Sequence, residues 1–168
     1  MMFEGAAAVV LHPHPSMGGD SSHPFVVDVA ARLAARGVNA VTPDLRDPDV
    51  DTAAAALVGI AESSQSDRLL LVGYSWGSVV TSHASPNDLV ARVLVAPPAS
   101  MQLGETSGVP TLVLVPEHDQ FGGPEKTRAA LEGQQRVTLE VVPGADHFLW
   151  GSIESIAQRC VDWLSTVD

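Results

Sequence analysis

The sequence has few of the features that mark disulfide-rich, nucleic-acid-binding or membrane proteins. Cys160 is its only cysteine, so no disulfide can form within the chain. Nine Lys and Arg stand against 20 Asp and Glu, and the resulting net charge of -11 repels phosphate backbones and anionic lipid surfaces. We therefore expect neither a nucleic-acid partner nor a membrane partner.

Long hydrophobic runs are missing as well. No stretch approaches the roughly 20 apolar residues of a membrane span, and the first residues lack the basic segment of a secretory signal. No segment is biased enough to be a linker or a disordered tail. With 168 residues and a hydrophobic content of 45%, the sequence predicts a single domain over residues 1–168, located in the cytoplasm.

The sequence does contain a series of short, continuously apolar runs separated by helical patterns. Such runs are typical of parallel strands covered on both faces of a sheet, because neither side of the strand then meets water. The six runs are Ala6–Leu11, Ala40–Thr42, Leu69–Gly73, Arg92–Ala96, Thr111–Val115 and Val137–Val142.

Helical start and stop signals lie between these runs. Pro24 stands near the start of the first apolar stripe, and Gly37 follows its end. Cys160 falls on the apolar stripe of the last helix, which predicts a buried thiol. The other helices are expected near Asp51–Ala61, between Ser75 and Pro86, from Pro124 to Gly133, and from Ile153 to Leu164.

One connection is too short for a full crossover helix. Residues 97–110 join two predicted strands, and these 14 residues only just exceed the roughly twelve that a parallel crossover needs. At most a turn or two of helix fits there.

The segment Gly73-Tyr-Ser-Trp-Gly77 carries the first sign of chemistry. It matches Gly-x-Ser-x-Gly and lies directly after an apolar strand and before a helix. In this setting the serine stands on a strained turn, and the flanking glycines avoid clashes with the crowded backbone. The pentapeptide alone also fits a glycine-rich turn with a solvated serine, so a catalytic role for Ser75 depends on partners.

A serine nucleophile needs an imidazole that takes its proton and a carboxylate that orients the imidazole. His147 follows the last apolar run, and both Glu117 and Asp119 follow the run before it. The carboxyl ends of parallel strands meet at one edge of the sheet, where open sheets bind their ligands. We expect Ser75, His147 and one of these acids to lie together. Asp146 is interpreted as a loop-structuring residue.

These motifs resemble those of the α/β-hydrolase superfamily, in particular its small, lidless members similar to dienelactone hydrolases. The segment His12-Pro-His-Pro-Ser-Met-Gly-Gly19 is similar to the HPHP-x-x-GG segment of some such hydrolases. Pro43-Asp-Leu-Arg46 resembles the segment after their next strand, and Gly144-Ala-Asp-His-Phe148 resembles their histidine loop. The first antiparallel strands of the family and its cap insertion have no counterpart.

The resemblance has consequences for fold and chemistry. It implies an open, doubly wound parallel sheet of about six strands in the order 2-1-3-4-5-6, with helices on both faces and no cap. It implies acyl-hydrolase chemistry without a cofactor, and it favours Asp119 over Glu117 as the orienting acid. The alternative acid position of this fold follows the preceding strand, where the sequence has no carboxylate.

An oxyanion needs converging N–H donors, one of them from the residue after the nucleophile, which is Trp76. The second donor should come from the loop after the first strand. There Pro13 and Pro15 have no N–H, so His14 is the best remaining donor, with Ser16 behind it.

The most favoured function is therefore a serine hydrolase that cleaves a small ester, thioester or lactone through an acyl-serine intermediate. Two alternatives remain: a ligand-binding or interaction protein without catalysis on the same scaffold, and a metal-dependent hydrolase. In the second alternative His12 and His14, which share a face of an extended segment, would borrow a ligand from His118, His147 or an Asp. A structural role for these histidines is preferred. The apolar side chains beside the motifs form either a short cleft wall or core, and they are Met17, Trp76, Phe121, Phe148 and Trp150.

Overall fold

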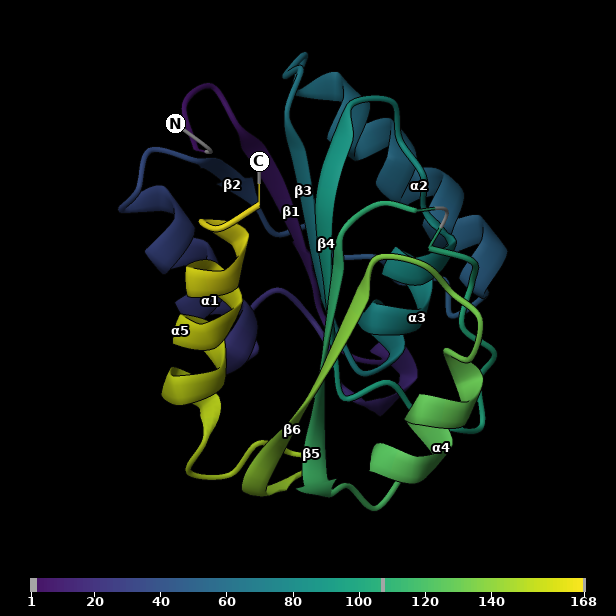
Figure 1. The fold of residues 1–168 in the computed structure, drawn as a ribbon. Coiled ribbons are helices and arrows are strands. Elements are labelled where there is room, and N and C mark those ends of the chain that lie inside the picture. Colours follow the sequence, from purple (N-terminus) through teal and green to yellow (C-terminus); the bar gives the residue numbers. More distant parts are fainter. Residues whose placement is uncertain (1–2, 107, 168) are drawn as a thin grey trace.

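The computed structural model describes residues 3–106 and 108–167, and a sheet of six parallel strands lies at its centre (Figure 1). The spatial order is β2-β1-β3-β4-β5-β6, which confirms the predicted order. The strands are β1 (Ala7–Leu11), β2 (Asn39–Val41), β3 (Leu69–Tyr74), β4 (Leu89–Val95), β5 (Thr111–His118) and β6 (Val137–Asp146).

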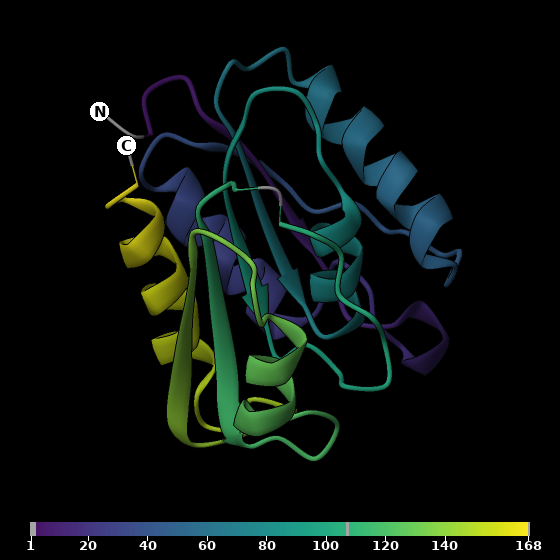
Figure 2. The ribbon, with the colours of Figure 1, turned by 45° about the vertical axis from the view of Figure 1, so that its right-hand side comes forward.

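Helices cover both faces of this sheet. α1 (Pro24–Ala34) and α5 (Ile153–Leu164) pack together on one face, whereas α2 (Val50–Ser63), α3 (Trp76–His83) and α4 (Pro124–Ala130) lie on the other (Figures 1 and 2). Asp49 caps α2 by accepting a hydrogen bond from the backbone N–H of Thr52. None of the described helices is long and apolar enough to span a membrane.

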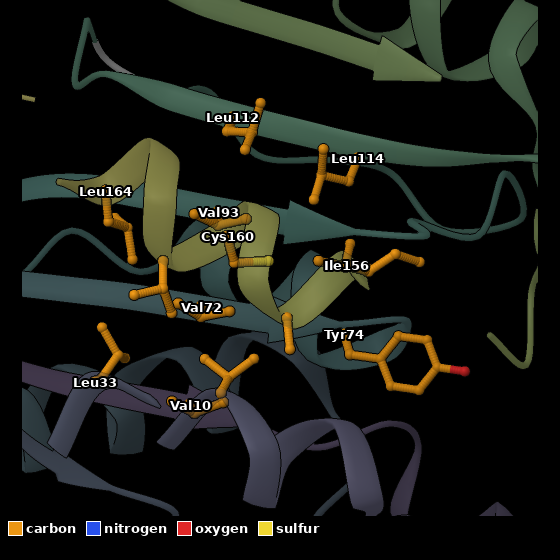
Figure 3. Close-up of a cluster of buried hydrophobic side chains, with 14 of the residues drawn as sticks. Val10, Leu33, Val72, Tyr74, Val93, Leu112, Leu114, Ile156, Cys160 and Leu164 are labelled. Atoms are coloured by element: carbon orange, nitrogen blue, oxygen red, sulfur yellow. The ribbon is translucent and has the colours of Figure 1, made fainter. Parts of the chain in front are cut away.

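β3 shows why the strands read as unbroken apolar runs in the sequence. Leu70, Val72 and Tyr74 contribute to the layer under α1 and α5, which Figure 3 shows in part. Leu69 and Leu71 contribute to the layer under α2 and α3. Alternate residues of a strand point to opposite faces, so a strand that is covered on both faces needs apolar residues at every position. Each large apolar side chain buried in this way stabilises the fold by about 1.5–3 kcal/mol.

Cys160 of α5 is fully buried within the first of these layers (Figure 3). Burial raises the pKa of its thiol, because a thiolate would lose its hydration there. The prediction of a buried thiol is confirmed.

β5 and β6 extend further than the sequence predicts. The predicted runs end at Val115 and Val142, and each is followed by a proline, which cannot donate to a strand ladder. The structure continues β5 to His118 and β6 to Asp146, with a shift of register within the extension. The prolines are tolerated because β6 is an edge strand, and because β5 no longer pairs with β4 beyond Leu114.

The connection between β4 and β5 contains no helix among its described residues, 96–106 and 108–110. Buried Arg92 ties this connection to the end of α3, because its guanidinium donates hydrogen bonds to the carbonyls of Ala84 and Thr106. Burial lowers the pKa of Arg92 to about 10. The described part of this crossover therefore places no helical cap over the carboxyl edge of the sheet.

Candidate active site

Ser75 occupies a strained turn between β3 and α3. Its φ of 56° and ψ of -122° lie in a region that residues with a Cβ rarely adopt. The flanking glycines make this turn possible. A Cβ added to Gly73 would lie 2.2 Å from the carbonyl oxygen of Gly77, and one added to Gly77 would lie 2.4 Å from that of His12. Both positions therefore require glycine for close packing.

Ser75, His147 and Asp119 form a continuous series of hydrogen bonds. The Oγ of Ser75 lies 2.9 Å from Nε2 of His147. On the other side of the ring, Nδ1 of His147 lies 2.9 Å and 3.1 Å from the two carboxylate oxygens of Asp119. The carboxylate accepts only, so Nδ1 carries the proton and Nε2 is free to accept the proton of the serine hydroxyl.

The carboxylate of Asp119 is held in place by the backbone as well. Its side chain is fully buried, and its Oδ1 accepts hydrogen bonds from the N–H groups of Phe121 at 2.8 Å and Gly122 at 3.1 Å. These two backbone donors fix the orientation of the carboxylate, so the imidazole that bonds to it is fixed too.

The neighbouring acids do not reach the imidazole. Glu117 is exposed, and its Oε2 accepts a hydrogen bond from the backbone N–H of Gly144 at 2.7 Å. Asp146 accepts from the N–H of Phe148 at 3.0 Å, which is the loop-structuring contact that we expected. Of the two acids left open by the residue pattern, Asp119 is the one beside His147.

Two further residues hold His147 through its backbone. The hydroxyl of Tyr74 donates a hydrogen bond to the carbonyl of His147 at 2.6 Å, and the N–H of His147 donates to Oε1 of Gln120 at 3.0 Å. Burial raises the pKa of Tyr74, and the charges of Asp119 and Asp146 raise it further. Sequence reasoning missed both residues, although Tyr74 occupies a variable position of the serine motif.

The two expected oxyanion donors line the same edge. Trp76 is the first residue of α3, and His14 precedes a short 3₁₀ helix, Pro15–Met17. Among residues 3–106 and 108–167, neither backbone N–H has a hydrogen-bond partner. The indole of Trp76 is buried and donates to the carbonyl of Pro48 at 3.0 Å, so this side chain belongs mainly to the core.

A cavity of about 290 Å³ opens at Ser75 and His147. Four of the side chains that the sequence suggested for its wall do line it: Met17, Trp76, Phe121 and Phe148. Trp150 does not line it: its side chain is 76% exposed and lies away from the cavity. Phe121 packs on the imidazole of His147, with 4.6 Å between ring centroids.

His12 is already bonded at both ring nitrogens. Its Nδ1 lies 2.6 Å from the carbonyl oxygen of Pro13, and its Nε2 accepts a hydrogen bond from the N–H of Leu45 at 2.9 Å. The ring also stacks on Trp76. Within residues 3–106 and 108–167, no three His, Cys, Asp or Glu side chains gather closely enough to hold a metal ion. The ring of His12 therefore ties the segment after β1 to the backbone of Leu45.

The chain is similar in structure to several solved hydrolases. An α/β serine hydrolase homologue from Coxiella burnetii has a TM-score of 0.77 and 22% identity, over 95% of this chain and 85% of its own. A lidless α/β serine hydrolase from Xanthomonas campestris has a TM-score of 0.76 and 23% identity, over 98% and 84%. Est1E from Butyrivibrio proteoclasticus, solved with bound ferulic acid, has a TM-score of 0.79 and 13% identity, over 95% and 88%.

No protein-family model matches the sequence, and no curated protein does either. The structural similarity covers nearly the whole chain, at identities of 13–23% in these three comparisons. The chain therefore has the α/β-hydrolase fold without a lid.

Proposed function

We propose that this chain, which has the lidless α/β-hydrolase fold, is a serine hydrolase that cleaves a small ester, thioester or lactone. The observation that carries the proposal is the hydrogen-bonded series Ser75–His147–Asp119 at the mouth of a cavity. Fold similarity alone does not specify chemistry, whereas this geometry provides a nucleophile, a base and a group that orients the base.

In the first half of the reaction, Oγ of Ser75 attacks the substrate carbonyl carbon while its proton moves to Nε2 of His147. The carbonyl oxygen becomes an oxyanion, which the backbone N–H groups of Trp76 and His14 would stabilise. When this intermediate collapses, the bond from carbon to the leaving oxygen or sulfur breaks. The protonated imidazole gives its proton to the leaving group, and the acyl group remains on Ser75.

Water completes the reaction. It gives a proton to His147 and attacks the acyl carbon, and the second tetrahedral intermediate collapses with Ser75 as the leaving group. His147 returns the proton to the serine oxygen, and the acid is released. Asp119 holds the imidazole in the tautomer that can perform both transfers and stabilises its positive charge, without taking a proton itself.

A fluorophosphonate probe tests the proposal directly, because it reacts with an activated serine and not with an ordinary solvated one. We expect one labelled residue, Ser75, and hydrolysis of at least one member of a panel of acetyl to butyryl esters and thioesters. The variant Ser75→Ala should lose labelling and at least about 10⁴-fold in kcat. Ser100→Ala is the matched control, because Ser100 lines the same cavity and has no imidazole partner among residues 3–106 and 108–167. Labelling that persists in Ser75→Ala would contradict the proposal.

A further inference from the structure

The cavity beside Ser75 is lined without any fixed charge. Its fifteen lining residues include no Asp, Glu, Lys or Arg. Besides Ser75 and His147, the polar side chains in the lining are His14, His23, Tyr74 and Ser100, and the hydroxyl of Tyr74 is already bonded to His147. Ser100 supplies a hydroxyl, and the two remaining histidines supply the imidazole groups through which the cavity can recognise a polar group of a substrate.

His14 and His23 share a local structure that their sequence imposes. Each stands directly before a proline, and a residue in that position is pushed into an extended conformation. His14 has φ -55° and ψ 125°, and His23 has φ -56° and ψ 131°. Each proline then begins a helix, and the histidine becomes the cap at its N-terminus.

The capping bonds fix the tautomers of both rings. Nδ1 of His23 accepts a hydrogen bond from the N–H of Phe25 at 3.2 Å, and Nδ1 of His14 accepts from the N–H of Ser16 at 3.1 Å. A nitrogen that accepts carries no proton, so each neutral ring carries its proton on Nε2. Among residues 3–106 and 108–167, neither Nε2 has a hydrogen-bond partner.

His23 is the better defined of the two donors. Its ring lies beside Tyr74, with 5.0 Å between ring centroids, and the ring of Tyr74 lies 6.1 Å from that of His147. Burial lowers the pKa of His23, an effect that the charge of Asp20 opposes. The capping bond to Phe25 favours the neutral ring, as burial does, because a doubly protonated ring could not accept it.

We infer that His23 is a specificity-determining residue whose Nε2–H binds an acceptor oxygen of an uncharged substrate, at a point away from the scissile carbonyl. The substrate class is an uncharged ester or thioester with a second acceptor, such as an ether, hydroxyl or carbonyl oxygen, in its acyl or alcohol part. Neither a cationic nor an anionic side chain lines the cavity, so a charged group of a substrate would find no ionic partner there, and the net charge of -11 further repels anions. The inference rests on the proposed hydrolase function for its kinetic consequences, but not for the binding itself.

Two substitutions separate the donor from the cap. His23→Asn keeps a short side-chain acceptor for the N–H of Phe25 and removes the Nε2–H donor, since Asn is a favoured capping residue. His23→Gln places an amide N–H near the former Nε2 and loses the cap. Neither residue change touches Ser75, His147 or Asp119.

Kinetics on isosteric substrate pairs then measure recognition. The first pair is p-nitrophenyl methoxyacetate and p-nitrophenyl butyrate, which release a coloured product. The second pair is 2-methoxyethyl acetate and butyl acetate, whose hydrolysis is followed by pH-stat titration of the acid formed. The ratio of kcat/KM for ether over hydrocarbon should fall about 3- to 10-fold in His23→Asn for at least one pair, mainly through KM. His23→Gln should keep the ratio and melt at a lower temperature. A ratio within about twofold of wild type in His23→Asn for both pairs would overturn the inference.

A binding experiment is independent of turnover. In Ser75→Ala, the ¹⁵N signals of His23 should show the tautomer protonated at Nε2 near neutral pH. The Nε2 signal should shift on titration with 2-methoxyethyl acetate and stay in place with butyl acetate. The opposite tautomer, or no shift with the ether, would contradict the assignment. If these shifts are observed but the wild-type protein hydrolyses no ester of the panel, the result contradicts the proposed function and not the binding role of His23.

Discussion

His118 and Asp146 are Cα partners at the ends of β5 and β6, and the residue that directly follows each strand is a member of the hydrogen-bonded series. The pair follows a shift of register, which lies between Pro116 and His118. Because the two strands are neighbours, the contact between Asp119 and His147 is set by this local pairing. Ser75 reaches the imidazole from a different strand, β3.

The first prediction concerns this acid. Asp119→Asn should lower kcat by about 10³- to 10⁴-fold with little change in KM, because an amide that turns its N–H₂ to Nδ1 favours the wrong tautomer of His147. Steady-state kinetics on an ester that the wild-type protein cleaves provide the measurement. Glu117→Gln is the matched control and should stay within about threefold of wild type, since Glu117 contacts the backbone of Gly144 and not the imidazole. The reverse ranking of the two variants would make Glu117 the orienting acid.

Tyr74 is the only tyrosine in the chain, so its ionisation can be followed alone by phenolate absorbance. Burial raises its pKa above the ordinary value of 10, and the nearby charges of Asp119 and Asp146 act in the same direction. The folded protein should therefore show no phenolate at pH 10, whereas protein unfolded in urea should be about half ionised there. A phenolate signal at pH 10 in the folded protein would contradict the buried hydrogen bond to His147.

The same shift has a consequence for stability. At alkaline pH the unfolded chain releases the tyrosine proton first, so this contribution to stability is present below pH 10 and is lost as the pH rises above it. Tyr74→Phe should remove this contribution to the dependence of the free energy of unfolding on pH.

The same variant, Tyr74→Phe, should also lower kcat about tenfold at constant KM, because the carbonyl of His147 loses its partner. An unchanged kcat would mean that Tyr74 only fills space.

The glycines of the serine turn allow a matched stability test. Gly77→Ala should destabilise by about 3 kcal/mol or more, because the added Cβ would lie 2.4 Å from the carbonyl oxygen of His12. Gly59→Ala is the control: Gly59 lies inside α2, and its added Cβ meets nothing within 4 Å. This variant should be more stable by about 0.5–1 kcal/mol, because alanine favours helix. Urea unfolding of both variants measures the difference.

The strands and the turn at Ser75 could be predicted from local sequence patterns, whereas the strand order came from the family resemblance. Apolar runs define strands, and the serine motif marks the turn at Ser75. Tyr74 and Gln120 were not predicted, since their contacts with His147 depend on how far β5 and β6 extend past their prolines. That extension comes from strand pairing, which single-strand propensities do not contain.

Trp150 illustrates the same limit at the cavity wall. Phe148 and Trp150 both follow His147 closely, and spacing alone assigns them alike. The intervening Leu149 has a φ of 59° and is fully buried. It anchors a turn in which Phe148 lines the cavity and Trp150 stays in solvent. Side-chain direction in such a turn follows from backbone angles that the sequence pattern does not specify.

The last prediction concerns the length of the acyl chain. The cavity measures about 290 Å³, and the residues at its apolar rim are open to water: Met17 is 76%, Phe121 46% and Phe148 44% exposed. A fully buried CH₂ contributes about 0.8 kcal/mol, or nearly fourfold in kcat/KM. Beyond butyryl each CH₂ should gain less than about 1.5-fold, because it would lie on this open rim. We therefore expect acetyl to butyryl esters to be preferred, without interfacial activation. A p-nitrophenyl ester series below micelle concentrations measures the trend, and a kcat/KM that climbs steadily to a twelve-carbon chain would require a deep acyl tunnel instead.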